Sequence, residues 1–327
     1  MTTDQPIALL FMAYGAPDSV DDVPAYLFDV RGGRETPESL VNLIKKRYEL
    51  IGGKSPLLEC TLEQARGVEA LLLQSSFRCR AYVGMRHWHP YIGDTLRSLL
   101  EDGYKTILAL CLVPHYSRLS IGVYYEELHK ALAELSMPVE VIEADGWHAH
   151  PGFLGAIAES VVSRLDRFSD FERRSLYVLF TAHSLPESIR ENNDPYEKQL
   201  RETSEGVIKL IDKIDGIGDQ MQSRWKLCFQ SAGVKSVPWI GPQLEEVLSQ
   251  LASEGVKNVL VVPIGFVADN VEILYDIDIV AGQKAADLGI RLIRTELMNS
   301  TPLFLEALAD FARTSIQERQ GNGLHNR

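Results

Sequence analysis

An internal repeat is the feature of this sequence that most constrains its fold. The segment Leu9–Ser19 (LLFMAYGAPDS) aligns without a gap with Val178–Ser188 (VLFTAHSLPES), and five of eleven positions are identical. Each segment reads as an apolar strand that ends at a polar residue and is followed by a proline-containing turn. Tyr14 in the first segment corresponds to His183 in the second. The repeat therefore indicates two similar halves, each presenting one polar side chain at the end of a strand.

A second match follows the first in the same order. Leu96–Leu108 (LRSLLEDGYKTIL) aligns with Leu248–Leu260 (LSQLASEGVKNVL), sharing three leucines, a glycine and a lysine. Both segments predict a helix, a glycine turn and a strand that ends in a Val-Pro pair. Any two helix–strand units share some of this pattern, so one match alone is weak. Two matches in the same order favour duplication.

The remaining chain alternates short apolar strands with amphipathic helices, which predicts an α/β fold. We expect two duplicated, doubly wound (Rossmann-like) domains with parallel sheets, at residues 1–148 and 149–327. Ligands bind at the carboxyl ends of the strands in such sheets, so the two domains are expected to face a central cleft. The predicted strands are Ile7–Ala13, Arg80–Gly84, Lys105–Leu112, Val139–Ile142, Leu176–Thr181, Trp225–Phe229, Asn258–Pro263 and Ile290–Ile293.

Composition excludes several classes of protein. The 327 residues carry a net charge of −12, which disfavours binding to nucleic acid and to anionic membranes. The four cysteines form no C-x-x-C pair, as is usual for a reducing cytosol. The N-terminus lacks the features of a signal peptide, and the longest apolar stretches, such as Val259–Ala268, fall short of the ~20 residues that a membrane span needs. We expect a cytoplasmic protein without a membrane span.

The strongest candidate for chemistry is His183, at the carboxyl end of a predicted strand. An imidazole in that position can accept a proton or bind a metal near neutral pH. Asp194 before Pro195 predicts the start of a long helix, so a loop of about ten residues separates His183 from that helix. A lone histidine is more often structural, but the correspondence with Tyr14 favours a function for His183.

Two carboxylates in Val262–Ile279 (VPIGFVADNVEILYDIDI) form a second candidate site. Asp269 or Asn270 can cap a helix that carries Glu272 and Asp276 on one face, near its N-terminal end. Apolar neighbours indicate that this helix is largely buried, and a buried carboxylate pair needs a partner or a purpose. The pair can move protons or a hydrated cation along the helix. A solvated acidic face is the alternative.

Basic residues gather in the N-terminal half. Arg31 and Arg34 flank two glycines, and Arg47 precedes the segment Ile51–Leu57 (IGGKSPL), which includes Ser55. Glycines allow backbone N–H groups to approach an anion, and an arginine guanidinium prefers a carboxylate or phosphate. Plain turns with solvated bases explain these residues equally well. Neither G-x-G-x-x-G nor G-K-[ST] follows a strand, so nucleotide binding has little support.

The other histidines form no clear site. His87 and His89, two residues apart, are interpreted as a surface pair or a packed helix start rather than as metal ligands. His115 follows a predicted strand at the edge where ligands bind, close in sequence to Tyr124. The sequence assigns His115 no role.

Together these motifs resemble the ferrochelatase family. The run LFTAHSLPESIRENNDPY around His183 is similar to the family signature, and VPIGFVADNVEILYDIDI resembles its second motif, with the essential glutamate at Glu272. QSAG at Gln230–Gly233, followed by WIGP at Trp239–Pro242, is similar to the connecting segment. The resemblance extends from about Ile7 to Phe311. It implies a class II chelatase-like fold and a lyase that inserts Fe²⁺ into a porphyrin, with His183, Glu272 and Asp276 as catalytic residues.

The N-terminal half resembles the branch of the family that acts on coproporphyrin III. That resemblance implies that Tyr14, together with His183 and Glu272, contacts the metal. It also implies that Tyr14, Arg31, Arg47, Ser55 and Tyr124 bind the substrate. The expected product is iron coproporphyrin III (coproheme), an intermediate of heme biosynthesis. A protoporphyrin IX ferrochelatase is the nearest alternative, and a cobalt chelatase or a non-catalytic porphyrin-binding protein is a more distant one.

Two departures from the family pattern affect the expected cofactors. Some relatives carry a further acid two turns after the glutamate, where Ile279 and Val280 stand here, so an outer divalent-metal site is in doubt. Other relatives bind a [2Fe–2S] cluster through C-terminal cysteines, whereas the last cysteine of this chain is Cys228. We therefore expect no iron–sulfur cluster and no cofactor beyond Fe²⁺ as substrate. The expected partners are the porphyrin, ferrous iron and the next enzyme of the heme pathway.

Overall fold

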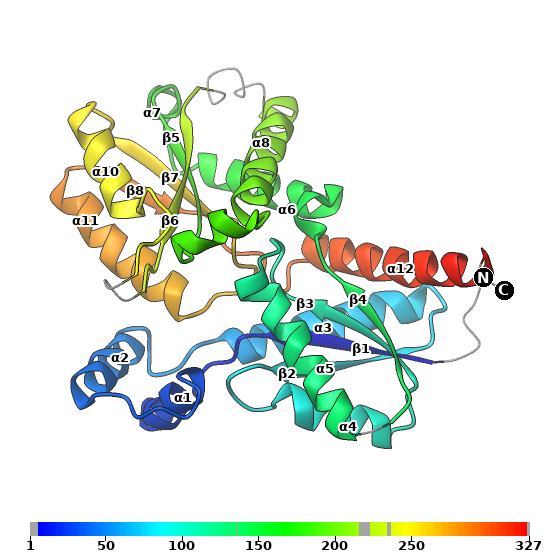
Figure 1. The fold of residues 1–327 in the computed structure, drawn as a ribbon. Helices are drawn as coiled ribbons and strands as arrows, with labels where there is room; N and C mark the ends of the chain where they lie inside the picture. The colour runs from blue at the N-terminus through cyan, green and yellow to red at the C-terminus, as the bar shows by residue number, and fades with distance from the viewer. Residues whose placement is uncertain (1–5, 136, 216–222, 234–236, 326–327) are drawn as a thin grey trace. The chain divides into compact units, whose positions relative to one another are not determined.

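The chain folds into two compact α/β units, seen here in a computed structural model that describes residues 6–135, 137–215, 223–233 and 237–325. Unit 1 comprises Met1–Pro114, Ser120–Trp147 and Asn299–Arg327, and unit 2 comprises His115–Leu119 and His148–Met298. Each unit is built on a four-stranded parallel sheet, in the order β2-β1-β3-β4 or β6-β5-β7-β8 (Figure 1). The predicted α/β class with two parallel sheets is confirmed.

All eight predicted strands are present, and their ends differ from the prediction by no more than two residues. β1 and β7 are buried along their whole length. Such continuous apolar strands are expected where helices cover both faces of a parallel sheet. The strands are β1 (Ile7–Ala13), β2 (Cys79–Met85), β3 (Thr106–Cys111), β4 (Glu140–Ala144), β5 (Tyr177–His183), β6 (Trp225–Gln230), β7 (Asn258–Pro263) and β8 (Arg291–Arg294).

Helices connect the strands and cover the sheets. In unit 1 these are α1 (Val23–Val30), α2 (Glu38–Leu50), α3 (Leu57–Gln74), α4 (Ile92–Glu101), α5 (Val123–Leu135) and α12 (Pro302–His325). In unit 2 they are α6 (Pro151–Leu165), α7 (Asp170–Arg173), α8 (Tyr196–Asp215), α10 (Leu244–Ser253), the π-helix η5 (Glu272–Ala281) and α11 (Gly282–Asp287). Shorter turns are η1 (Val20–Asp22), the π-helical η2 (Arg118–Gly122), η3 (Trp147–Ala149) and η4 (Glu187–Asn192).

The duplication extends to individual backbone hydrogen bonds. Leu112 N–H donates to the Met12 carbonyl at 2.9 Å, and Ile264 N–H donates to the Thr181 carbonyl at the same distance. The two sequence matches make Met12 equivalent to Thr181 and Leu112 equivalent to Ile264. The same bond therefore joins the carboxyl end of the central strand to its neighbour in each sheet. The repeat in the sequence is a repeat in the structure.

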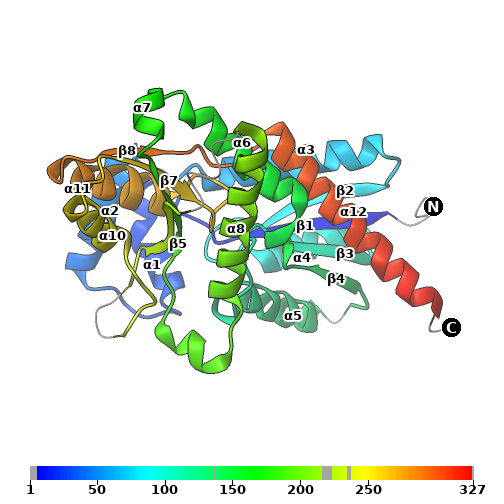
Figure 2. The same ribbon diagram turned by 90° about the horizontal axis from the view of Figure 1, so that it is seen from above.

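The helix that follows the last strand of each unit belongs to the other unit. α6 follows β4 of unit 1 but packs on α8 in unit 2, and α12 follows β8 of unit 2 but packs on α3 in unit 1 (Figure 2). The buried stripe of α12 is Phe304, Leu308, Ala312 and Ile316. The expected domain of residues 149–327 thus differs from unit 2 in its C-terminal segment, which belongs to unit 1.

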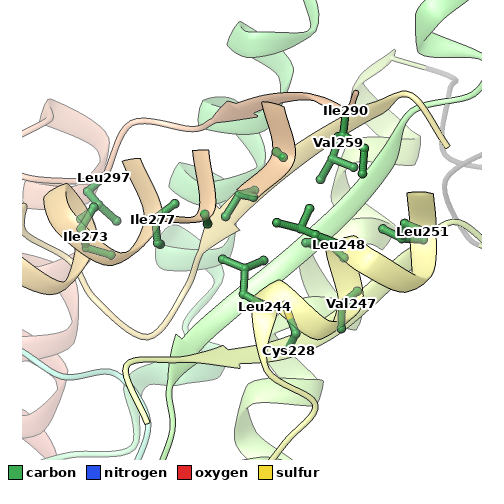
Figure 3. Packing of buried hydrophobic residues seen from close by; sticks show 14 residues of the cluster. Cys228, Leu244, Val247, Leu248, Leu251, Val259, Ile273, Ile277, Ile290 and Leu297 are labelled. Atoms are coloured by element: carbon green, nitrogen blue, oxygen red, sulfur yellow. The ribbon is translucent and has the colours of Figure 1, made fainter. Parts of the chain in front are cut away.

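The described helices include none that is long and apolar enough to cross a membrane. Unit 2 instead buries its apolar surface inside, where α10 and η5 pack on β5 and β7 (Figure 3). Leu248 is fully buried in the middle of this cluster. Because burial of apolar surface is the main favourable term in folding, this cluster holds the π-helix on its sheet.

We expect Leu248→Ala to lower the free energy of unfolding by about 2–5 kcal/mol, because it removes buried methyl groups and leaves a cavity. Leu303→Ala is the control, since Leu303 lies on the surface of α12 with 42% of its area exposed. Denaturant unfolding followed by circular dichroism measures both. Equal losses in the two variants would contradict this account of the core.

Candidate active site

His183 is the last residue of β5, and a hydrogen bond fixes which of its nitrogens carries the proton. Nδ1 lies 2.5 Å from the carbonyl oxygen of Ser184. A carbonyl only accepts, so Nδ1 is the protonated nitrogen and Nε2 keeps a free lone pair. The side chain is half-buried. His183 is therefore set up to accept a proton or to bind a metal through Nε2.

Ser184 and Leu185, the two residues after His183, are held by three further hydrogen bonds. Ser184 N–H donates to the Gln230 carbonyl at 2.8 Å, and its hydroxyl donates to the Ile240 carbonyl at 2.7 Å. Leu185 accepts a hydrogen bond from Ile240 N–H at 2.9 Å. The acceptor of the His183 proton is therefore part of a rigid backbone.

The loop after β7 passes directly over the end of β5. A Cβ atom on Gly265 would lie 2.7 Å from the Ala182 side chain and 2.9 Å from its Cα, so only glycine fits there. The ring centroids of Phe266 and His183 are 6.3 Å apart. This contact brings the segment that leads to Glu272 next to His183.

Glu272 and Asp276 lie on η5, which is a π-helix rather than the α-helix that the spacing predicts. The predicted cap is confirmed, because Asn270 Oδ1 accepts a hydrogen bond from Ile273 N–H at 3.0 Å. Ser231 donates a short hydrogen bond to Asp276 Oδ2. π-helical turns are rare in proteins, and those that occur are often found at functional sites. Both acids are half-buried, and neither is simply part of a solvated face.

Arg294 on β8 holds the π-helix in place. Its Nε and Nη2 donate to the two carboxylate oxygens of Asp278, at 2.6 and 2.9 Å, and its Nη1 lies 3.6 Å from Asp269. The two carboxylates raise the pKa of the Arg294 guanidinium against the effect of its burial. Asp269 precedes η5 and Asp278 is within it, so one arginine fixes the helix that carries Glu272.

Gln230 brings an unsatisfied amide to this region. It pairs with His183 in the register of β5 and β6, and only 3% of its area is exposed. Neither its side-chain oxygen nor its side-chain nitrogen has a hydrogen-bond partner among the described residues. A buried polar group without a partner costs free energy, so it is expected mainly where a ligand satisfies it.

In unit 1, Tyr14 follows β1 at the position equivalent to His183. Its ring packs on His87, with the centroids 4.7 Å apart, and its carbonyl accepts a hydrogen bond from His87 N–H. His87 Nδ1 lies 2.7 Å from Asp29 Oδ1. Burial lowers the pKa of His87, and the Asp29 carboxylate opposes that shift. The interpretation of His87 as half of a surface pair is wrong, because it is 91% buried, whereas His89 is exposed.

The other predicted substrate-binding residues are also in unit 1. Arg31 ends α1, and its Nε is buried without a hydrogen-bond partner among the described residues. Arg47 lies in the last turn of α2, and Ser55 is buried just before α3, where its hydroxyl accepts a hydrogen bond from Leu57 N–H at 3.3 Å. Tyr124 is buried in α5, with the Arg86 guanidinium 5.9 Å from its ring centre.

Several of these partners were not predicted from the sequence. Asp29 and Arg294 support the predicted residues through contacts between distant segments, and no local pattern marks them; Ser231 was named only as part of the QSAG segment. Gln230 had one available signal, its place in the QSAG segment at the end of a strand. Within the part of the chain that the structure describes, no three His, Cys, Asp or Glu side chains are grouped closely enough to hold a metal ion.

Comparison with known proteins assigns the family. A ferrochelatase family profile matches residues 6–316. A ferrochelatase from Deinococcus radiodurans is 40% identical over 318 residues, covering 97% of this chain and 98% of the relative. The chain belongs to the ferrochelatase family. A coproporphyrin III ferrochelatase from a Geobacillus species (strain WCH70) is 37% identical, covering 93% of this chain and 96% of that protein.

Solved structures support the fold of this ferrochelatase. The sirohydrochlorin chelatase SirB from Bacillus subtilis subspecies spizizenii, in complex with cobalt, covers 97% of this chain with a TM-score of 0.56 and 14% identity. CbiX, the terminal enzyme of siroheme biosynthesis in denitrifying bacteria, covers 95% with a TM-score of 0.52 and 9% identity. At such identities the likeness concerns the fold alone, and it confirms the expected class II chelatase-like architecture.

His115, to which the sequence assigned no role, is held inside unit 2. It is fully buried, and Thr203 donates its only hydroxyl proton to the His148 carbonyl. The contact of 2.9 Å between His115 Nε2 and the Thr203 hydroxyl therefore has His115 as donor. Burial and the neighbouring His148 hold the pKa of His115 well below its ordinary value of 6.5.

This shift predicts a loss of stability in acid. Below about pH 6.5 residue 115 is protonated in the unfolded chain but not in the folded chain. The free energy of unfolding therefore falls by up to ~1.4 kcal/mol for each unit by which the pH decreases. His115→Gln keeps a donor for Thr203 and should flatten this dependence. Urea unfolding at about pH 7.5 and about pH 5.5 measures it. The exposed His129 supplies the control variant His129→Gln, which should retain the slope of the wild type.

Proposed function

We propose that this ferrochelatase inserts Fe²⁺ into coproporphyrin III and releases iron coproporphyrin III for heme biosynthesis. The observation that carries the catalytic part of the proposal is His183, whose Nδ1 donates to Ser184 and whose Nε2 is left with a lone pair. The substrate assignment is supported by the sequence around Tyr14 and by relatives named coproporphyrin III ferrochelatase. Protoporphyrin IX is the alternative substrate.

In the proposed mechanism, unit 2 handles protons and iron. A metal-free porphyrin must lose two N–H protons as Fe²⁺ binds its four nitrogens, so insertion releases two protons. His183 accepts the first of these at Nε2 or makes the first contact with iron. Glu272 and Asp276 accept protons and transfer them along η5. The hydrogen bond from Ser231 supports this role, because it holds the Asp276 carboxylate in one orientation.

Unit 1 is proposed to recognise the porphyrin through its carboxylates. Coproporphyrin III carries four propionates, twice the number on protoporphyrin IX. Several basic residues therefore stabilise its binding more than they stabilise the binding of protoporphyrin IX. Arg31, Arg47, Ser55 and Tyr124 are assigned to these groups, and the unpartnered Nε of Arg31 supports this for one of them. Tyr14 is assigned to the metal. Binding energy from the propionates is then available to bend the ring so that its nitrogens become accessible to iron.

The remaining assignments follow from the same proposal. The protein acts in the cytoplasm, needs no cofactor beyond Fe²⁺ as substrate, and contains no iron–sulfur cluster. Its product passes to the next enzyme of the heme pathway.

Substrate choice is tested by comparing the two porphyrins directly. In an anaerobic assay with Fe²⁺, followed by porphyrin absorbance, we expect kcat/KM for coproporphyrin III to exceed that for protoporphyrin IX by at least about tenfold, because two more carboxylates are bound. Arg31→Ala should lower this ratio, whereas Arg97→Ala, which removes an exposed arginine paired with Asp94, should not. A preference for protoporphyrin IX would establish the alternative.

The catalytic assignment is tested by separating binding from turnover. His183→Ala should lower kcat by about 10²–10⁴-fold, the usual contribution of a general base, while coproporphyrin III still binds and quenches tryptophan fluorescence. Glu272→Gln should lower kcat more than it raises KM, and it should alter the pH–rate profile. If His183→Ala turns over at the rate of the wild type, His183 has no part in the reaction.

A further inference from the structure

A hydrogen bond links the first residue of α8 to the candidate catalytic histidine. The hydroxyl of Tyr196 donates to the carbonyl oxygen of His183 at 2.9 Å, across a loop of twelve intervening residues. Tyr196 is 95% buried. Burial and the neighbouring Asp194 raise the pKa of its hydroxyl, so Tyr196 remains a donor throughout the pH range in which proteins are folded. The bond reaches the backbone of His183 and leaves the imidazole free.

This hydrogen bond completes the restraint of one peptide group. The peptide between His183 and Ser184 has its carbonyl bound by Tyr196 and its N–H bound by the Gln230 carbonyl. The next carbonyl along the chain, that of Ser184, accepts the proton of His183 Nδ1. The Tyr196 hydroxyl therefore acts one peptide group away from the acceptor that determines the tautomer of His183.

Tyr196 is itself fixed by residues from a distant part of the chain. Asp194 Oδ1 accepts a hydrogen bond from Tyr196 N–H at 3.0 Å, and Asp194 Oδ2 accepts from the Ser117 hydroxyl at 2.9 Å and from Arg118 N–H at 2.8 Å. The rings of Tyr196 and His115 are perpendicular, with their centroids 6.4 Å apart. All of these residues belong to unit 2. The segment His115–Leu119 and the start of α8 thus form one hydrogen-bonded unit that holds Tyr196 in place.

We propose that Tyr196 is a positioning residue for His183: its hydroxyl holds the 183–184 peptide so that the Ser184 carbonyl keeps Nδ1 protonated and Nε2 free. Tyr196 touches neither iron nor porphyrin and acts only through His183. The inference rests on the proposed function to the extent that His183 Nε2 takes part in metal insertion. The claim about the tautomer stands on the structure of this chain alone.

A purely structural role for Tyr196 gives different expectations. If the hydroxyl only satisfied a buried carbonyl, its removal would lower the free energy of unfolding and leave the chemistry of folded protein unchanged. A positioning role requires that folded, porphyrin-bound protein reacts more slowly.

The test uses Tyr196→Phe, which removes one oxygen and keeps the ring. We expect kcat to fall by about tenfold with KM for coproporphyrin III unchanged, which corresponds to the loss of about one hydrogen bond. Tyr177→Phe is the matched control. Tyr177 lies on β5, the strand that ends at His183, and its hydroxyl also donates to a backbone carbonyl, that of Trp225, at 3.5 Å. The control should retain the kcat of the wild type.

The tautomer is read separately by ¹⁵N-detected NMR of the histidine side chains, with the His183 signals assigned from their loss in His183→Ala. Wild-type His183 should show a protonated Nδ1 and a bare Nε2, and Tyr196→Phe should show a mixture of the two tautomers. This measurement needs no substrate. If the wild type inserts no iron, the proposed function fails, whereas the NMR result still decides whether Tyr196 positions His183.

The double variant completes the test. Because Tyr196 acts through His183, adding Tyr196→Phe to His183→Ala should lower the residual rate by less than twofold. A full tenfold loss on top of His183→Ala would overturn the proposal, as would an unchanged tautomer in Tyr196→Phe. Should Tyr196→Phe fail to fold, Ser117→Ala withdraws one of the hydrogen bonds to Asp194 and should produce a smaller tautomer shift in the same direction.

Discussion

Parallel pairing of a central strand with both of its neighbours is the constraint from which the rest of this structure follows. β1 pairs with β2 and β3, and β5 pairs with β6 and β7, always in the parallel sense. Each connection must therefore cross back over the sheet, and every strand ends at the same edge. Tyr14, His183 and Gln230 all lie at such ends. The topology allows polar loops at that edge of each sheet and apolar strands elsewhere, so the candidate residues come at the ends of strands.

The exchange of terminal helices explains why a repeat in sequence does not divide this chain into two independent domains. In unit 1 α3 packs on α12, and in unit 2 α8 packs on α6. α12 comes after the last strand of unit 2, and α6 comes after the last strand of unit 1. Residues 149–327 expressed alone would leave the apolar stripe of α12 without α3. We infer that the two halves fold as one chain, although each sheet has its own core.

Much of the fold was predictable from the sequence, because strand and helix patterns are local. All eight strands could be placed, and helix caps were predicted at Asp194 and at either Asp269 or Asn270, of which the structure uses Asn270. The packing of α12 on unit 1 could not be predicted, since an apolar stripe indicates that a helix packs on a surface but does not indicate which one. The π-helix η5 was also missed. An i, i+4 pair of acids has the same spacing in either helix type, and only the wider hydrogen-bonding pattern of the folded chain distinguishes them.

The candidate site was predictable in part, and the division has a physical reason. His183 and Glu272 stand out because a polar residue at the end of an apolar strand, or on a buried helix, needs an explanation. Their supports do not stand out. Tyr196 and Ser231 lie in the runs LFTAHSLPESIRENNDPY and QSAG, but nothing in those runs, or in the sequence around Arg294, predicts the contacts that folding forms with His183, Asp276 and η5.

The equivalent positions Tyr14 and His183 show how far two duplicated positions can differ. The two residues end equivalent strands, so the fold presents both in the same way. Their surroundings have diverged: Tyr14 is packed on an imidazole whose Nδ1 meets the Asp29 carboxylate, whereas His183 donates its own Nδ1 proton to a backbone carbonyl. A carboxylate partner increases the electron density of an imidazole more than a carbonyl does. His87, the imidazole beside Tyr14, therefore has a charged acceptor, and His183 has a neutral one.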